Sequence, residues 1–160
     1  MQPPFLQKLV DALVSSRVRF VIIGGVALNI QGHARATEDF DVCYARDREN
    51  LVNLAAALAP LNPRLRGAPA GLPFVLDVPT LRAGLNFTLS TDAGAIDLLG
   101  EVTGLGGYAA ADALADEFEF FGHKLLVLNL DGLERTKKAA GRPKDLVDLG
   151  SIAELKKRRG

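Results

Sequence analysis

FVIIGGVALNIQGHARATEDFDV, residues 20–42, carries the clearest structural signal in this sequence. Its β-branched apolar start is typical of a strand buried on both faces, and Gly24 and Gly25 end that strand. GVALNIQG (25–32) predicts a short helix. EDFDVCYA (38–45) then alternates acidic and apolar residues, which is the period of a half-buried strand. The stretch therefore predicts a strand, a glycine turn, a short helix and a second strand in immediate succession.

Asp39 and Asp41 stand two residues apart on the second predicted strand, so their carboxylates should leave the same face of the sheet. Phe40 and Val42 should point the other way, into the core. The strand rise puts the two acidic Cα atoms ~6.5 Å apart, and carboxylates at that spacing can bind a pair of Mg²⁺ ions ~3.5–4 Å apart. An acidic, solvated strand end would give the same pattern, so the pair alone does not establish a metal site.

A third acidic residue would complete such a site. Asp97 lies between Ile96 and Leu98 on an otherwise apolar predicted strand, where a charge is costly unless it is paired, metal-bound or facing solvent. Asp92 and Glu101 are alternatives, but their positions fit a turn and a strand end. We therefore expect Asp97 to be the third metal ligand and the proton acceptor.

Gly24 and Gly25 would let the backbone approach a phosphate closely, and the helix that follows would offer it free N–H groups. Strand–helix turns also use glycines for steric reasons alone. Two other ligand-binding motifs are excluded. An EF-hand loop starting at Asp39 requires glycine where Tyr44 stands, and a Walker A loop requires a Gly-Lys pair that GGVALNIQG lacks.

The rest of the chain predicts further helices and strands around this stretch. Apolar residues recur at helical spacing over 4–16, and an Ala/Leu-rich helix is expected over 47–59, while prolines make 60–80 a loop with at most a short extended piece. Residues 101–115 are rich in glycine and alanine and do not predict one type of secondary structure. The other expected elements are a strand hairpin over 85–91 and 95–101, a strand pair over 116–122 and 124–129, and helices over 130–140 and 142–157. The resulting fold class is α+β (α/β), a small mixed twisted sheet flanked by helices with a C-terminal helical hairpin.

The length of 160 residues fits one domain, with a core over about 18–128 and C-terminal helices over about 129–157. No apolar run approaches the ~18 to 20 residues that cross a bilayer, so no membrane association is expected. One cysteine and two histidines argue against an internal disulfide and a zinc site, and favour a cytoplasmic location. A net charge of zero gives no support to broad, sequence-independent nucleic-acid binding, although residues 134–159 are basic.

The Gly-Gly turn, the short helix, the D-x-D strand and the later strand aspartate, in this order, resemble the nucleotidyltransferases of the DNA polymerase beta-like superfamily. RATEDFDV (35–42) and LERTKKAAGRPKDLVDL (133–149) look like the small bacterial branch that contains the AbiEii-like toxins. The resemblance spans roughly residues 18–152. It implies the nucleotidyltransferase fold and a reaction that depends on two Mg²⁺ ions, with Mn²⁺ as a substitute.

The same resemblance implies a role for each matching residue. Gly24 and Gly25 would cradle the β- and γ-phosphates of a nucleoside triphosphate, and the three acids would hold the metal ions. Lys137 would contact the triphosphate, and Asp145 would help to shape the nucleotide site. Lys137 and Asp145 also have an ordinary structural explanation, because cations are favoured in the last turn of a helix and acids in the first.

The implied activity is transfer of a nucleoside monophosphate to a hydroxyl of RNA, most plausibly a tRNA end, or of a protein. The chain would then be the toxin of a toxin–antitoxin system, with an antitoxin as partner. Two alternatives stay open from the sequence. One is modification of a small molecule, as by the aminoglycoside-modifying relatives; the other is a non-catalytic antitoxin or partner-binding module of the same fold.

Overall fold

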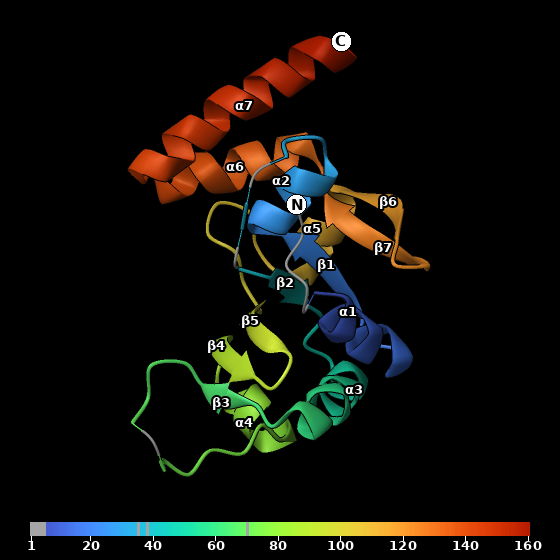
Figure 1. Ribbon diagram of the computed structural model, residues 1–160, viewed down its shortest axis with the longest axis vertical. Helices are drawn as coiled ribbons and strands as arrows, with labels where there is room; N and C mark the ends of the chain where they lie inside the picture. The colour runs from blue at the N-terminus through green and yellow to red at the C-terminus, as the bar shows by residue number, and fades with distance from the viewer. Residues whose placement is uncertain (1–5, 35, 38, 70) are drawn as a thin grey trace.

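The computed structural model describes residues 6–34, 36–37, 39–69 and 71–160. The expected start of the first helix at residue 4 and of the second strand at Glu38 lie outside these ranges. The elements below are numbered in chain order, as in Figure 1.

A seven-stranded mixed sheet organises the chain, in the order β3-β4-β5-β2-β1-β7-β6. β1 pairs in parallel with β7, and β2 pairs in parallel with β5, whereas the other neighbouring strands are antiparallel. This arrangement confirms the expected α+β fold with a mixed sheet. The strands are β1 (Phe20–Ile23), β2 (Asp41–Tyr44), β3 (Arg64–Leu65), β4 (Asn86–Thr91), β5 (Gly94–Leu99), β6 (Ala115–Phe120) and β7 (His123–Leu128).

α2 and α5 pack on the central strands β1, β2 and β7, and the other helices lie towards the two ends of the molecule (Figure 1). α6 and α7 pack together at one end as the predicted C-terminal hairpin, and α3 packs on α1 and α4 at the other. The bounds are α1 (Leu6–Ser15), α2 (Gly24–Ile30), α3 (Arg48–Leu58), α4 (Val78–Ala83), α5 (Tyr108–Ala113), α6 (Leu130–Ala140) and α7 (Pro143–Arg159), with a 3-10 turn over Ala59–Leu61.

The core forms where the sequence pattern places it. α1 buries Leu6, Leu9, Val10 and Leu13, the three-and-four spacing of one helical face. All four residues of β1 are buried, as expected for a central strand covered on both faces. The burial of these apolar side chains holds the central strands rigidly in place, and the candidate site lies at the ends of those strands.

Two short helices occur where the sequence predicts none. α4 begins inside the proline-rich loop, where the Asp77 side chain accepts a hydrogen bond of 2.9 Å from the Thr80 amide and Pro79 occupies the first turn. α5 lies within the ambiguous stretch 101–115. Each spans only six residues, which is too short for apolar periodicity to register.

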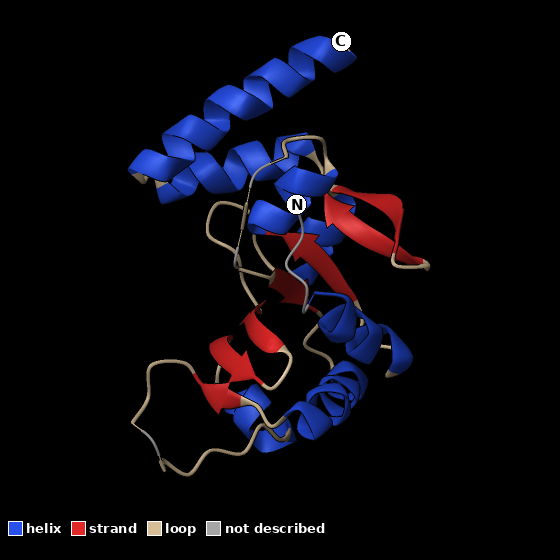
Figure 2. Cartoon of the chain, in the orientation of Figure 1, coloured by secondary structure: helices blue, strands red, loops and turns tan. Residues whose placement is uncertain are grey.

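The remainder of the proline-rich stretch, between β3 and α4, projects from the body as a long loop (Figure 2). Elsewhere in the described chain, no helix combines the length and the apolar character that a membrane span requires. Cys43 is a free thiol buried in β2.

Candidate active site

Asp41 and Asp97 meet on two adjacent strands. Asp41 is the first residue of β2, Asp97 lies within β5, and the two are direct partners in the parallel β2–β5 register. Partners at one register position point to the same face of a sheet, so both side chains lie together. Each is half-buried. The structure therefore brings the expected third acid beside one member of the D-x-D pair.

Asp39 lies before β2 rather than on it, so the expectation that both acids of the D-x-D pair sit on one strand is wrong. The β1–β2 ladder ends at the pair Ile23–Asp41, because the chain turns into α2 at Gly24 and offers no further partner. Phe40, directly before β2, stays tied to the sheet through its carbonyl, which accepts a hydrogen bond of 2.9 Å from the Asp97 amide. Asp39 is exposed as a result.

The three carboxylates nevertheless line one cavity of about 270 Å³. Asp41 and Asp97 are within hydrogen-bonding reach of each other. In the part of the chain that the structure describes, no group of three or more His, Cys, Asp or Glu side chains is arranged to hold a metal ion. The site thus consists of a close acidic pair with Asp39 at its exposed edge.

The donor set fits a hard divalent cation. Oδ1 of Asp41 is buried and has no hydrogen-bond partner among the described residues. An unsatisfied carboxylate oxygen next to a second carboxylate is costly to bury, and an oxygen-ligated ion such as Mg²⁺ would satisfy both. A rotation of the exposed Asp39 side chain towards the pair would supply the third ligand.

Asp41 is under electrostatic strain in the metal-free protein. Burial, followed by the negative charge of Asp97 and that of Asp39, raises the pKa of Asp41 to about 7. Lys137 opposes this shift with its positive charge. A carboxyl that resists ionisation at neutral pH is typical of a site built to bind a cation, and also of strained buried pairs.

Gly24 allows Asp41 to occupy this position. Gly24 has a left-handed backbone, with φ of +68°, and a Cβ built on it would lie 2.5 Å from Oδ2 of Asp41. Gly25 follows as a buried residue of α2, and both glycines line the cavity. The glycine that the sequence suggested for phosphate approach therefore also makes room for the acid.

We expect the Gly24→Ala substitution to lower the expected nucleotidyl transfer about a hundredfold, because an ångström-scale displacement of the Asp41 carboxylate misplaces a group at the reaction site. Gly122→Ala is the matched control, since Gly122 has φ of +78° and open space around its Cβ. Both variants should lose about 1–2 kcal/mol of unfolding free energy from left-handed strain, measured by urea denaturation. Equal activity in the two variants would contradict the role assigned to Gly24.

The turn between α6 and α7 is fixed by local sequence. Gly141 ends α6 in the left-handed conformation, with φ of +63°, and Pro143 occupies the first turn of α7. Asp145 caps α7 by accepting the Arg142 amide hydrogen at 3.0 Å, and the Arg142 guanidinium Nε donates to the same carboxylate at 2.7 Å. These bonds to Arg142 hold the pKa of Asp145 at about 2.

Lys137 links this turn to the acidic pair. Its ammonium lies 2.9 Å from Asp148 and 3.5 Å from Asp145, two carboxylates that are completely buried. The Lys137 side chain is itself only 9% exposed, yet it lines the cavity. The structure therefore makes Asp145 and Lys137 parts of one buried charge cluster in the cavity wall.

The cavity has an acidic side and a basic side. Arg142 and Lys144 line it together with Lys137, and neither was singled out from the sequence. Both stand in the segment KKAAGRPKD, so their closeness in sequence to Lys137 and Asp145 could have identified them as site residues. Apart from these charged groups, the wall includes hydroxyls from Thr37, Thr103 and Thr136.

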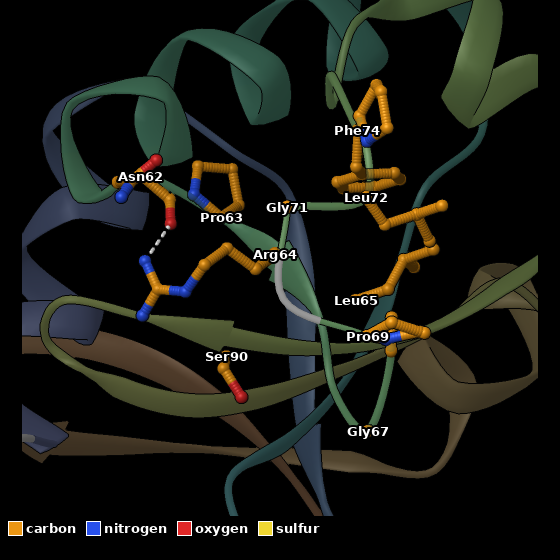
Figure 3. A pocket seen from close by; sticks show the side chains of 12 residues that line it. Asn62, Pro63, Arg64, Leu65, Gly67, Pro69, Gly71, Leu72, Phe74 and Ser90 are labelled. Atoms are coloured by element: carbon orange, nitrogen blue, oxygen red, sulfur yellow. Dashed lines mark hydrogen bonds between the residues drawn. The ribbon is translucent and has the colours of Figure 1, made fainter.

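A second and larger cavity, of about 610 Å³, lies under the loop that follows β3 (Figure 3). Arg64 crosses it and donates a hydrogen bond of 2.7 Å to the Asn62 carbonyl. Ser90 of β4 lines the opposite side, and no acidic residue lines it within the described chain. Leu65, Leu72 and Phe74 also line this cavity.

Comparison with known proteins yields structural likeness only. No protein-family model matches the sequence, and no curated protein matches it either. Among solved structures, the chain is similar to a Thermotoga maritima protein provisionally assigned as a nucleotidyltransferase, with 16% identity and a TM-score of 0.52 over 96% of this chain and 88% of that one. It is also similar to the aminoglycoside nucleotidyltransferase ANT(2″)-Ia, with 14% identity and a TM-score of 0.57 over 97% of both chains. The chain therefore has the fold of the nucleotidyltransferases.

Proposed function

We propose that this chain is a metal-dependent nucleotidyltransferase that moves a nucleoside monophosphate from a nucleoside triphosphate to a hydroxyl group. The observation that carries the proposal is the pairing of Asp41 with Asp97 at a cavity whose other wall is basic. An acidic pair can hold metal ions, and the basic side chains that face it can hold a polyphosphate. The likeness to two nucleotidyltransferases supports this reading through the fold.

Asp39, Asp41 and Asp97 would hold two Mg²⁺ ions, or Mn²⁺ in their place. When bound, the ions would neutralise the charge that develops on the triphosphate during transfer. This assignment is supported by the unsatisfied Oδ1 of Asp41 and by the purely oxygen character of the three side chains.

The remaining residues of the cavity would position the substrate. Gly24 and Gly25 would admit the β- and γ-phosphates close to the backbone, and Lys137 would neutralise part of their charge, with Asp145 fixing the turn that holds the lysine. The acceptor oxygen would form a bond to the α-phosphorus as the bond to the departing pyrophosphate breaks. The proton of the acceptor hydroxyl would pass to the Asp97 carboxylate.

We favour an RNA or protein hydroxyl as the acceptor. Lys144 is exposed and lines the cavity, where its charge would attract an RNA backbone and would repel a polyamine. A small-molecule acceptor is the second candidate, and it is favoured by the likeness to ANT(2″)-Ia, which was solved with adenylyl-2″-tobramycin. The acceptor class is therefore the first thing to measure.

The deciding experiment incubates the protein and Mg²⁺ with each α-labelled nucleoside triphosphate in turn, together with total RNA, total protein or tobramycin. We expect label in RNA or protein, and none after chelation of the metal. Label in tobramycin alone would transfer the proposal to the small-molecule class. If nothing is labelled, and the Asp39→Ala, Asp41→Ala variant binds nucleotide as well as the wild type does, the chain is a binding module rather than an enzyme.

The AbiEii-like toxin role is a separate part of the proposal and has its own test. Induced expression of the wild type in a bacterial cytoplasm should arrest growth, because modification of an RNA or protein acceptor would block its use. Expression of Asp97→Asn at the same level should not. Normal growth with the active wild type would remove the toxin role, and with it the need for an antitoxin partner.

A further inference from the structure

Arg66 reaches across the sheet to the acidic pair. It directly follows β3, and its amide donates a hydrogen bond of 3.0 Å to the Thr88 carbonyl of β4. Thr88 is the register partner of Asp97, and Asp97 is the register partner of Asp41. Arg66, Thr88, Asp97 and Asp41 therefore form one row that runs across the sheet, perpendicular to the strands. The Arg66 guanidinium extends along this row to Asp97.

The contact between Arg66 and Asp97 is electrostatic rather than a directed hydrogen bond. Nη2 of Arg66 lies 2.8 Å from Oδ1 of Asp97, yet that oxygen is buried and has no hydrogen-bond partner among the described residues. The guanidinium instead donates to backbone carbonyls, to Leu89 at 2.6 Å and to Ile96 at 3.4 Å. Arg66 thus neutralises the carboxylate without satisfying it as an acceptor.

Such a contact is the kind that a metal ion can replace. Asp41 and Asp97 repel each other, so the metal-free pair needs a positive charge nearby. Arg66 supplies one from the residue that directly follows β3, a short edge strand of two residues. Its side chain is 32% exposed, so solvent lies within reach when it leaves Asp97.

We propose that Arg66 is an internal counter-ion that occupies the metal position of Asp97 and withdraws when a divalent cation binds. This inference rests on the proposed metal site. The neighbours of Arg66 in the chain, Arg64, Leu65 and Gly67, line the larger cavity in Figure 3.

The first test measures Mn²⁺ affinity by electron paramagnetic resonance in the absence of nucleotide. Arg66→Gln should bind Mn²⁺ about tenfold more tightly than the wild type, because the ion no longer competes with a fixed charge. Arg66→Lys keeps the charge and should resemble the wild type. Arg64→Gln is the matched control, since Arg64 lies two residues before Arg66 but pairs with the exposed Asp92. Its Mn²⁺ affinity should not change.

The second test uses the wild type and does not depend on the folding of a variant. Trypsin cleaves after arginine, so Mn²⁺ should increase cleavage between Arg66 and Gly67 relative to cleavage between Arg64 and Leu65. Unchanged Mn²⁺ affinity in Arg66→Gln, or Mn²⁺ protection of the 66–67 bond, would overturn the counter-ion role.

These outcomes are separable from those of the proposed function. Transfer of label by the wild type, with equal Mn²⁺ affinity in the wild type and Arg66→Gln, would overturn the counter-ion role alone. A tenfold difference in Mn²⁺ affinity without any transfer of label would support the counter-ion role and overturn the enzymatic proposal.

Discussion

Asp41→Asn should lower nucleotidyl transfer about a thousandfold or more while it makes the metal-free protein more stable. The loss follows because the amide removes one negative charge from the carboxylates that would hold the metal. A thousandfold loss of rate corresponds to about 4 kcal/mol of transition-state stabilisation. The gain follows because burial and the neighbouring Asp97 disfavour the charged form of Asp41. An activity loss that accompanies a stability gain is not expected of a residue whose role is structural.

The pH dependence of stability gives the sign of this effect. The pKa of Asp41 is raised from 3.8 to about 7 by folding, so the native protein binds more protons than the unfolded chain between these values. The free energy of unfolding should therefore fall as pH rises from about 4 to about 7, by on the order of 1 to 4 kcal/mol. Asp41→Asn should lack this decline, and Mg²⁺ should reverse it in the wild type.

Urea denaturation at several pH values, together with the labelling assay, measures both halves of the prediction. Asp92→Asn is the control, because Asp92 lies in the β4–β5 turn and pairs with Arg64 at the surface. It should change neither the activity nor the pH profile. An Asp41→Asn protein that is less stable than the wild type at pH 8 without metal would show that the acidic pair is not strained.

Lys137→Met should destabilise the protein by about 3–5 kcal/mol. Lys137 contacts both Asp145 and Asp148, and removal of the cation from a buried charge cluster is strongly destabilising because it takes a counter-charge away from two buried carboxylates. Arg142 continues to neutralise Asp145 in this variant. The variant should also bind nucleoside triphosphate more weakly, since Lys137 lines the cavity.

Lys138→Met is the matched control for this prediction. Lys138 is the next residue of α6, but its side chain is 66% exposed and, among the described residues, pairs only with Glu134, at 3.6 Å. An exposed pair of this kind contributes at most about 1 kcal/mol, so the unfolding free energy should change little. Equal losses in the two variants, measured by urea denaturation, would contradict the buried charge cluster.

Local sequence was sufficient for the elements whose signal lies within a few residues. The predicted helix over 130–140 matches α6, because Asn129 caps its start and Gly141 ends it. The hairpin of β4 and β5 follows from two alternating runs around a short turn. α4 and α5 were not predicted, because a helix of about one and a half turns has too few residues for an apolar periodicity to be recognised.

The site residues divide in the same way. The sequence by itself singled out the candidate site residues: Asp39 and Asp41 from their spacing, Asp97 from its charge in an apolar strand, and Gly24 from its place at the strand end. It could not determine that Asp97 stands in register with Asp41, since that depends on β5 pairing in parallel with β2 across the centre of the sheet. Nor could it reveal Arg66, which no local pattern distinguishes within a proline-rich loop. Only the tertiary structure decided these contacts, because strand order and register are set by burial of the whole sheet rather than by neighbours along the chain.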